Sequence, residues 1–248
     1  MSEILITTAL KRPYVVAFLL SYLIIAWRIT GPKWTLIYLF VGYGIAFASE
    51  YLSINFGFPY GWYTYVYENL RGEWLNHGVP VWDSVSYVFM NFAGLCTAYL
   101  AVGCPANPTL NKKIALVLYS ALFVMLLDVV IDPVAHLGER WFLGKIYYYP
   151  HPGFYFDVTL ANFAGWYLTS LLVNSFAVFA LGFAPRENLS PPLHQAAALG
   201  LYYGIFAFGL VIALYLKQWG IVISDLFWIS LTIGLIRWSS SFSRQDYP

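Results

Sequence analysis

The segment Lys112–Pro133, "KKIALVLYSALFVMLLDVVIDP", opens with two lysines, continues as an apolar run, and ends on two aspartates and a proline. A helix over residues 113–131, rising about 1.5 Å per residue, is long enough to cross a bilayer core about 30 Å thick. A run of this length with so few polar residues predicts a membrane-spanning helix.

The composition of the whole chain agrees with this prediction. Of its 248 residues, 60% are hydrophobic and 10% are charged, against about 25% charged residues in a soluble domain. Lipid allows only helices or closed barrels to span it, and the alternating pattern of barrel strands is absent. The formal net charge is +1 without a basic run, so we expect no nucleic-acid partner. Cys96 and Cys104 are isolated and suit neither a disulfide framework nor a metal site.

Short polar or Pro/Gly-rich breaks divide the chain into seven apolar segments. We therefore predict an all-α, polytopic integral membrane bundle of about seven transmembrane helices, forming a single domain over 1–248. The predicted helices are 14–28, 33–53, 81–102, 113–131, 159–183, 194–216 and 221–238. Because no small-residue cleavage site follows Lys11 and Arg12, we interpret Pro13–Trp27 as a retained span and not as a signal peptide.

Two connections, 54–80 and 132–158, are long and rich in Tyr, Trp, Phe, Gly and Pro. Such loops tend to be functional, and their aromatic content argues against disorder. In a chain with seven spans, the second and fourth connections lie on the same side, so we expect both aromatic loops on one face. The acids in or next to the spans fall on that face too: Glu50, Asp83, Asp128, Asp132, Asp157 and Asp225.

The spacing of Asp128 and Asp132 places both carboxyl groups on one face of a helix, which we expect Pro133 to end. Two stacked carboxylates at a membrane boundary repel each other when both are ionised, so the pair favours holding a proton that it can donate. The alternative is structural: Asp132 terminates the helix, and Asp128 pairs with Arg140 or Lys145.

Glu50 lies deep in the second predicted span, where a free charge is costly, so it needs a partner or a proton. A glutamate that extends to the membrane interface is the alternative. The aromatic segments "FPYGWYTYVY" (58–67) and "IYYYPHPGFYF" (146–156) fit an interfacial belt. Their glycines and prolines, however, set a specific backbone path that would let aromatic faces line a cavity and stabilise a cation.

Several kinds of chemistry lack their motifs. The four histidines form no i, i+4 pairs, and no dinucleotide fingerprint, phosphate loop or nucleophile elbow is present. The last segment, "IVISDLFWISLTIGLIRW" (221–238), contains no lysine for a retinal Schiff base. We therefore expect no metal and no cofactor, and acid chemistry on an apolar substrate.

Four segments, in this order, resemble the membrane-integral carotenoid biosynthesis proteins whose characterised members are carotenoid 1,2-hydratases, including the bisanhydrobacterioruberin and γ-carotene hydratases. The segments are "SEYLSINFGFPYGWYTY" (49–65), "GVPVWDSVSYVFMNFAG" (78–94), "DVVIDPVAHLGERWFLGKIYYYPHPGFYF" (128–156) and "NFAGW" (162–166). The chain departs from the family pattern at Asp157, where the family has glycine, and at Thr159, where it has proline.

The resemblance implies a cofactor-independent hydratase, a lyase that adds water across the terminal C1–C2 double bond of an acyclic carotenoid end group. It implies Asp132 or Asp128 as the acid and Glu50 as its partner or as the residue that positions water. The expected aromatic lining is Tyr60, Trp62, Tyr63, Tyr65, Tyr148 and Trp166. Asn162 either hydrogen-bonds the water or caps the fifth span. The expected surroundings are the lipid bilayer of a prokaryotic cytoplasmic membrane, and the oligomeric state stays open.

Two other functions use the same residues. A cofactor-free isoprenoid cyclase or isomerase would share the proton donor and differ only in what captures the cation. A proton-coupled carrier or lipid-binding membrane protein would use the acids as relays or ion-pair partners. The carrier would be expected to show inverted repeats, and the sequence has no internal repeat.

Overall fold

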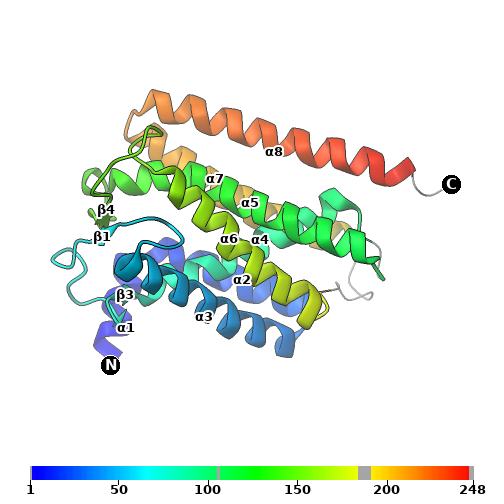
Figure 1. The fold of residues 1–248 in the computed structure, drawn as a ribbon, viewed down its shortest axis with the longest axis horizontal. Coiled ribbons are helices and arrows are strands. Elements are labelled where there is room, and N and C mark those ends of the chain that lie inside the picture. Colours follow the sequence, from blue (N-terminus) through cyan, green and yellow to red (C-terminus); the bar gives the residue numbers. More distant parts are fainter. Residues whose placement is uncertain (1, 105–106, 184–190, 246–248) are drawn as a thin grey trace.

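The computed structural model describes residues 2–104, 107–183 and 191–245, and most of them are helical (Figure 1). The helices are α1 (Ser2–Lys11), α2 (Pro13–Thr30), α3 (Pro32–Phe56), α4 (Val81–Val102), α5 (Leu110–His136), the short η1 (Gly138–Arg140), α6 (Leu160–Ser175), the π-helical η2 (Phe176–Ala180), α7 (Pro191–Tyr215) and α8 (Trp219–Gln245). Four two-residue strands, β1 (Thr64–Tyr65), β2 (Leu75–Asn76), β3 (Val79–Pro80) and β4 (Tyr147–Tyr148), lie in the connections.

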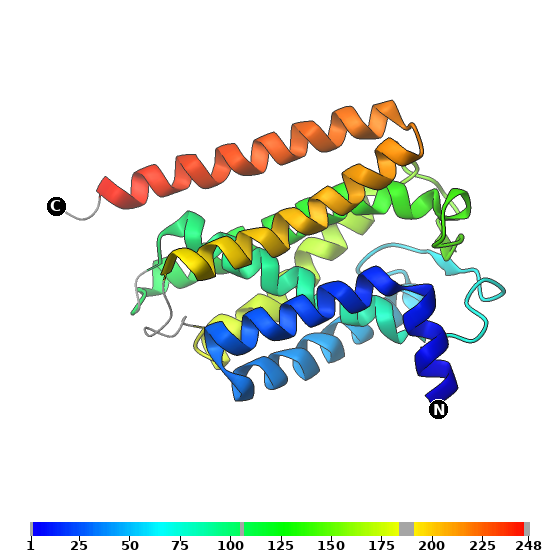
Figure 2. The same ribbon diagram turned by 180° about the vertical axis from the view of Figure 1, so that it is seen from behind.

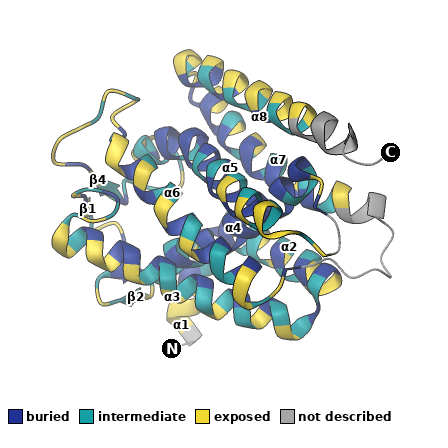
Figure 3. Ribbon diagram, turned by 45° about the vertical axis from the view of Figure 1, so that its right-hand side comes forward, coloured by how far each residue is buried: buried dark blue, intermediate teal, exposed yellow. Residues whose placement is uncertain are grey.

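Seven of these helices are long and apolar enough to cross a membrane, which confirms the predicted fold class. The spans are Pro13–Thr30, Pro32–Phe56, Val81–Val102, Leu110–His136, Leu160–Ala180, Gln195–Tyr215 and Trp219–Trp238. Each lies within a few residues of its predicted position, and α1 is an additional helix that the hydropathy pattern did not indicate. The apolar outer faces of the bundle, seen as exposed positions along α8 in Figure 3, fit contact with lipid.

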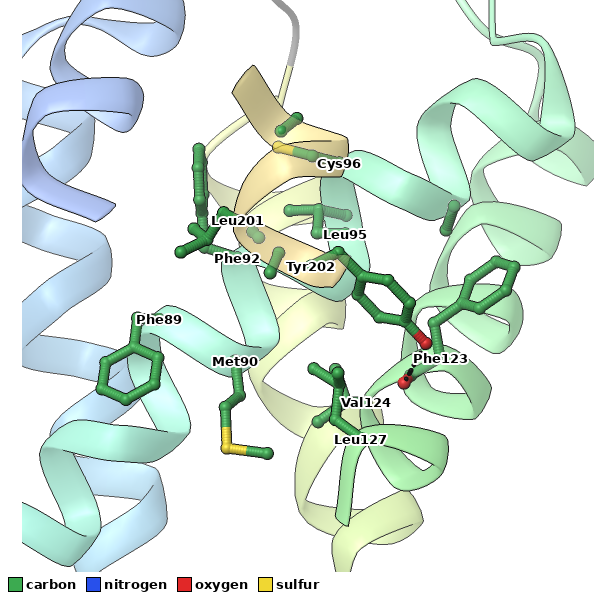
Figure 4. Close-up of a cluster of buried hydrophobic side chains, with 14 of the residues drawn as sticks. Phe89, Met90, Phe92, Leu95, Cys96, Phe123, Val124, Leu127, Leu201 and Tyr202 are labelled. Carbon is green, nitrogen blue, oxygen red and sulfur yellow. Dashed lines mark hydrogen bonds between the residues drawn. The ribbon is translucent and has the colours of Figure 1, made fainter. Parts of the chain in front are cut away.

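Helix α4 is the centre of the bundle. Within its membrane-spanning window 78% of the residues are buried, against 22% for α2 and for α8. Figure 4 shows Leu95 of α4 near Tyr202 of α7, whose ring lies beside Phe123 of α5. The Tyr202 hydroxyl donates a 2.8 Å hydrogen bond to the Phe123 carbonyl. The central helix therefore joins the others by close packing, since lipid supplies no hydrophobic drive between helices.

The prediction that Pro133 ends the helix is wrong, because α5 continues to His136. A proline has no N–H for the carbonyl four residues earlier, so the Val129 carbonyl is left without its helical donor. The Tyr155 hydroxyl donates to that carbonyl at 3.3 Å and also lies 2.8 Å from the Ser224 hydroxyl of α8. Tyr155 of the second aromatic loop thus supplies the hydrogen-bond donor that the proline lacks, and it joins α5 to α8.

The two aromatic loops meet at one end of the bundle, as span parity predicts. Strands β1 and β4 pair antiparallel with Tyr65 opposite Tyr147. The Val66 N–H donates to the Ile146 carbonyl at 2.8 Å, which extends the pairing by one residue. In Figure 1 this pair lies at the end of the bundle opposite the C-terminus of α8. A small two-stranded contact therefore holds two segments about eighty positions apart along the chain together at the same end of the bundle.

We predict that Gly94→Ala destabilises the bundle and that Gly44→Ala does not. A Cβ at position 94 of α4 would lie 2.5 Å from a Val124 methyl and 3.1 Å from the Ser120 carbonyl oxygen of α5. A Cβ at position 44 of α3 meets nothing within 4 Å. Overpacking of this kind costs about 1–3 kcal/mol. Denaturant titration in detergent measures the free energy of unfolding, and equal values for the two variants would contradict this packing.

Candidate active site

A cavity opens beneath the paired loops, with about 920 Å³ of empty space when its mouth is counted. Its walls come from α2 to α7 and from both aromatic loops. The polar lining consists of Glu50, Asp83, Ser86, Asp128, Asp132 and Asn162, among the tyrosines Tyr14, Tyr60, Tyr63, Tyr65, Tyr87, Tyr147 and Tyr149. Phe18, Phe89, Met90, Ile131, Ala135, Leu143, Ile146, Trp166, Ile205 and Phe208 complete it.

The two aspartates of α5 face one amide of α6. The Asn162 side-chain nitrogen donates to Asp128 Oδ2 at 2.8 Å and to Asp132 Oδ2 at 2.9 Å. All three side chains are buried. One NH₂ group thus uses both of its hydrogens to hold two carboxyl groups together, and we call these three residues the acid pair and its bridge.

The two carboxyl groups of the acid pair differ in their other partners. Asp132 also accepts from the Tyr147 hydroxyl at Oδ1 and from the Tyr149 hydroxyl at Oδ2, the latter at 3.1 Å. Asp128 accepts only from Asn162 among the described residues, which leaves its Oδ1 open on the cavity wall. Three donors suit an ionised carboxylate at Asp132, whereas Asp128 has an oxygen available for other chemistry.

The structural alternatives for this helix end do not hold. Asp128 pairs with Asn162, while Arg140 donates to the Leu216 carbonyl at 3.3 Å. Asn162 does not cap the fifth span with its side chain, because the Thr159 hydroxyl accepts the Asn162 backbone N–H at 3.2 Å and supplies the cap. The asparagine side chain is therefore free to bridge the acid pair.

Glu50 lies on the same cavity from α3. It is 4% exposed, and its Oε2 accepts a 2.7 Å hydrogen bond from the Ser84 hydroxyl of α4. Its Oε1 has no hydrogen-bond partner among the described residues. Glu50 therefore points into the protein, not out to the interface, and it presents an acceptor to the cavity.

A buried ion cluster beside Glu50 was missed from the sequence. Arg12, the residue before α2, is 2% exposed and bonds through Nη1 to Asp83 of the cavity wall. Its Nε lies 2.8 Å from Glu73 Oε2, an ionic contact without hydrogen-bond alignment. Burial opposes the charge, but the carboxylates, Asp83 first, outweigh it and raise the pKa of Arg12. Arg12 and its neighbour Lys11 look alike in sequence, and only the fold separates them.

The aromatic residues divide into an inward and an outward set. Tyr60, Tyr63, Tyr65 and Trp166 line the cavity as expected. The expectation for two others is not supported: Trp62 is 56% exposed and Tyr148 is 42% exposed, and neither lines it. Successive residues of an extended chain point to opposite sides. Tyr63 and Tyr65 therefore point inward while Trp62 points outward.

The same alternation reveals two cavity residues that were missed. Tyr147 and Tyr149 lie on either side of the outward Tyr148 and are the donors to Asp132. Burial raises the pKa of both hydroxyls above the ordinary value, so they stay protonated donors at neutral pH. Trp166 stacks on Tyr87 of α4, with ring centroids 3.8 Å apart and planes 7° apart. Side chains alternate in direction along an extended segment, so the run "YYY" (147–149) was the sequence signal that the two tyrosines flanking Tyr148 share a side.

Fold and cavity together define a class: a seven-span membrane protein with carboxyl groups facing an aromatic-walled chamber. The carotenoid biosynthesis protein family model matches residues 11–232, so the chain belongs to that family. Searches of curated proteins and of solved structures gave no match. Among the described residues, no three His, Cys, Asp or Glu side chains gather as metal ligands would.

We predict that Tyr149→Phe destabilises the protein and that the adjacent Tyr148→Phe leaves its stability unchanged. The first removes a donor to a buried carboxylate, and the second removes an outward hydroxyl with no hydrogen bond among the described residues. A hydrogen bond to a charged group contributes about 1.5–3 kcal/mol. Denaturant titration of the two variants checks this, and an equal loss would contradict the assigned alternation.

Proposed function

We propose that the chain is a hydratase that adds water across the C1–C2 double bond of an acyclic carotenoid end group. The supporting observation is that Asp128, with one free oxygen, faces the same aromatic chamber as Glu50, with one free oxygen. Acid-catalysed hydration needs a proton donor, a wall that tolerates a cation, and a base for the incoming water. Family membership supports a substrate of this apolar class.

In the first step, Asp128 donates its proton to C2. The electron pair of the C1–C2 double bond forms the new C2–H bond, and a tertiary cation remains at C1. The carboxylate left on Asp128 keeps its hydrogen bond from Asn162, so the amide holds the resulting pair of anions together. The negative charges and the faces of Tyr87 and Trp166 stabilise the cation.

In the second step, water attacks C1 while Glu50 accepts its proton. The Ser84 hydroxyl fixes one Glu50 oxygen and leaves the other for the water. A new C1–O bond forms, giving a tertiary alcohol. The cycle closes when the proton gained by Glu50 returns to Asp128, so one water is added and no other group is consumed.

An isomerase or cyclase would share the first step. It would let the cation lose a proton, or let an internal alkene attack C1, without water. The polar Glu50–Ser84 pair on the cavity wall supports water capture, because it can hold an incoming water and accept its proton. An isomerase would use the same acceptor for a proton lost from a carbon next to C1, so the mass of the product separates the two reactions.

We predict that bacteria producing lycopene gain a carotenoid heavier by one or two waters when they express this chain. Asp128→Asn removes the proton and should reduce the product at least a hundredfold, the lower range for loss of a general acid. Asp132→Asn should also reduce the amount of hydrated product, because it removes the carboxylate beside Asp128. Asp157→Asn is the control, because Asp157 is exposed and lies outside the cavity lining.

Mass spectrometry of the extracted pigments decides between the functions. Hydrated product from Asp128→Asn at the level of the native chain would contradict the assigned acid. An isomer of unchanged mass from the native chain would replace hydration by cyclisation or isomerisation. No product from well-expressed protein would count against both reactions on this substrate.

A separate prediction distinguishes the roles of Asp128 and Glu50. In deuterated medium, Glu50→Gln should form little hydrate but should still exchange deuterium into the recovered lycopene, because protonation at C2 is reversible without a base for water. Asp128→Asn should show neither hydration nor exchange. Mass spectrometry of recovered substrate reads both, and exchange lost equally in the two variants would contradict separate roles.

A further inference from the structure

The cavity is chemically asymmetric. Its carboxyl groups come from α3, α4 and α5 and its amide from α6, while α2 and α7 contribute Tyr14, Phe18, Ile205 and Phe208. Phe89 and Met90 of α4 continue this apolar side inward. A substrate whose reactive end lies at the acids would therefore place its hydrocarbon against α2 and α7.

The cavity is too small for a whole carotenoid. Extended lycopene is comparable in length to the bilayer core, about 30 Å, whereas the space that water-sized molecules can occupy in the cavity is about 150 Å³. If the chain acts on such a molecule, as proposed above, an end group enters and the rest of the polyene must lie outside. The opening has to meet lipid, because the polyene is as apolar as the membrane interior.

The seam between α2 and α7 borders the apolar side of the cavity. The two helices are in contact, and Figure 2 shows them, dark blue and yellow to orange, diverging toward the end that carries the loops. The cavity residues of α2, Tyr14 and Phe18, come from its first turns, at that diverging end. Both helices expose apolar residues outward, such as Leu20 on α2 and Val211 on α7.

Side chains, not backbone, close the seam at the level of the cavity. Phe208 stacks on Tyr14 with ring centroids 4.8 Å apart and planes 17° apart, and meets Phe18 edge-on at 6.0 Å. Trp141 of the second aromatic loop contacts the same ring at 6.1 Å. The Trp141 indole N–H is held by the Val134 carbonyl at 2.9 Å, whereas the Phe208 ring has no polar group to anchor it. Phe208 is therefore the ring that can change its rotamer without moving a helix.

We propose that the seam between α2 and α7 is the lateral portal through which the polyene chain leaves the cavity, with Phe208 as its gate. The inference rests on the proposed function for its occupant. Phe18 and Phe208 then flank the chain and select long, linear hydrocarbons.

Two glycines of α7 provide a matched test. A Cβ at Gly204 would lie 3.9 Å from Phe18 Cε1, an ordinary contact, so the side chain of Gly204→Leu is directed into the seam. A Cβ at Gly200, one turn away, meets nothing within 4 Å, so Gly200→Leu adds the same side chain outside it. Both are placed on the Asp128→Asn background, which holds substrate without turnover.

The measurement is the amount of lycopene that co-purifies per protein from lycopene-producing cells. We expect Asp128→Asn/Gly204→Leu to lose at least about tenfold, and Asp128→Asn/Gly200→Leu to stay within about twofold. Equal retention in the two would overturn the portal, and so would absence of lycopene from all variants. Native protein that binds lycopene, with the expected difference between the glycines, but forms no hydrate would reject the proposed reaction and leave the portal intact.

Discussion

The site depends on two hydrogen bonds that one asparagine amide donates to two aspartates. Asn162 of α6 and the Asp128 and Asp132 carboxyl groups of α5 are buried, and among the described residues no lysine or arginine forms an ion pair with either aspartate. An unpaired charge in that position would be expensive. The amide, with two hydrogens and two acceptors to satisfy, fixes the distance between the aspartates and so makes them act as one unit.

The rest of the fold positions this unit. Packing of α5 on α4 and α6 sets the position of the acid pair within the bundle. The pairing of β1 with β4 brings Tyr147 and Tyr149 to Asp132. Pro133 leaves a helical carbonyl free, and Tyr155 uses it to tie the second aromatic loop to α5 and α8. Backbone pairing of the loops therefore holds Tyr147 and Tyr149 against Asp132.

Helix periodicity and span parity predicted much of this arrangement. The seven spans, the shared face of the two loops, and the placement of Glu50 on the same face as the acid pair follow from counting apolar segments. Side-chain direction in the loops was not predicted. Trp62 and Tyr148 are aromatic like the inward tyrosines next to them, so residue type alone does not separate the two directions. Arg12 could not be found either, since its partners Glu73 and Asp83 are more than sixty positions away and the intervening chain sets the contact.

In the proposed mechanism Asp128 carries the transferable proton and Asp132 stays a carboxylate. Infrared spectroscopy of the protein in lipid at neutral pH tests this, because a protonated carboxyl has a C=O stretch that a carboxylate lacks. We expect a protonated-carboxyl band that disappears in Asp128→Asn and persists in Asp132→Asn. A band that persists in Asp128→Asn and disappears in Asp132→Asn would contradict it.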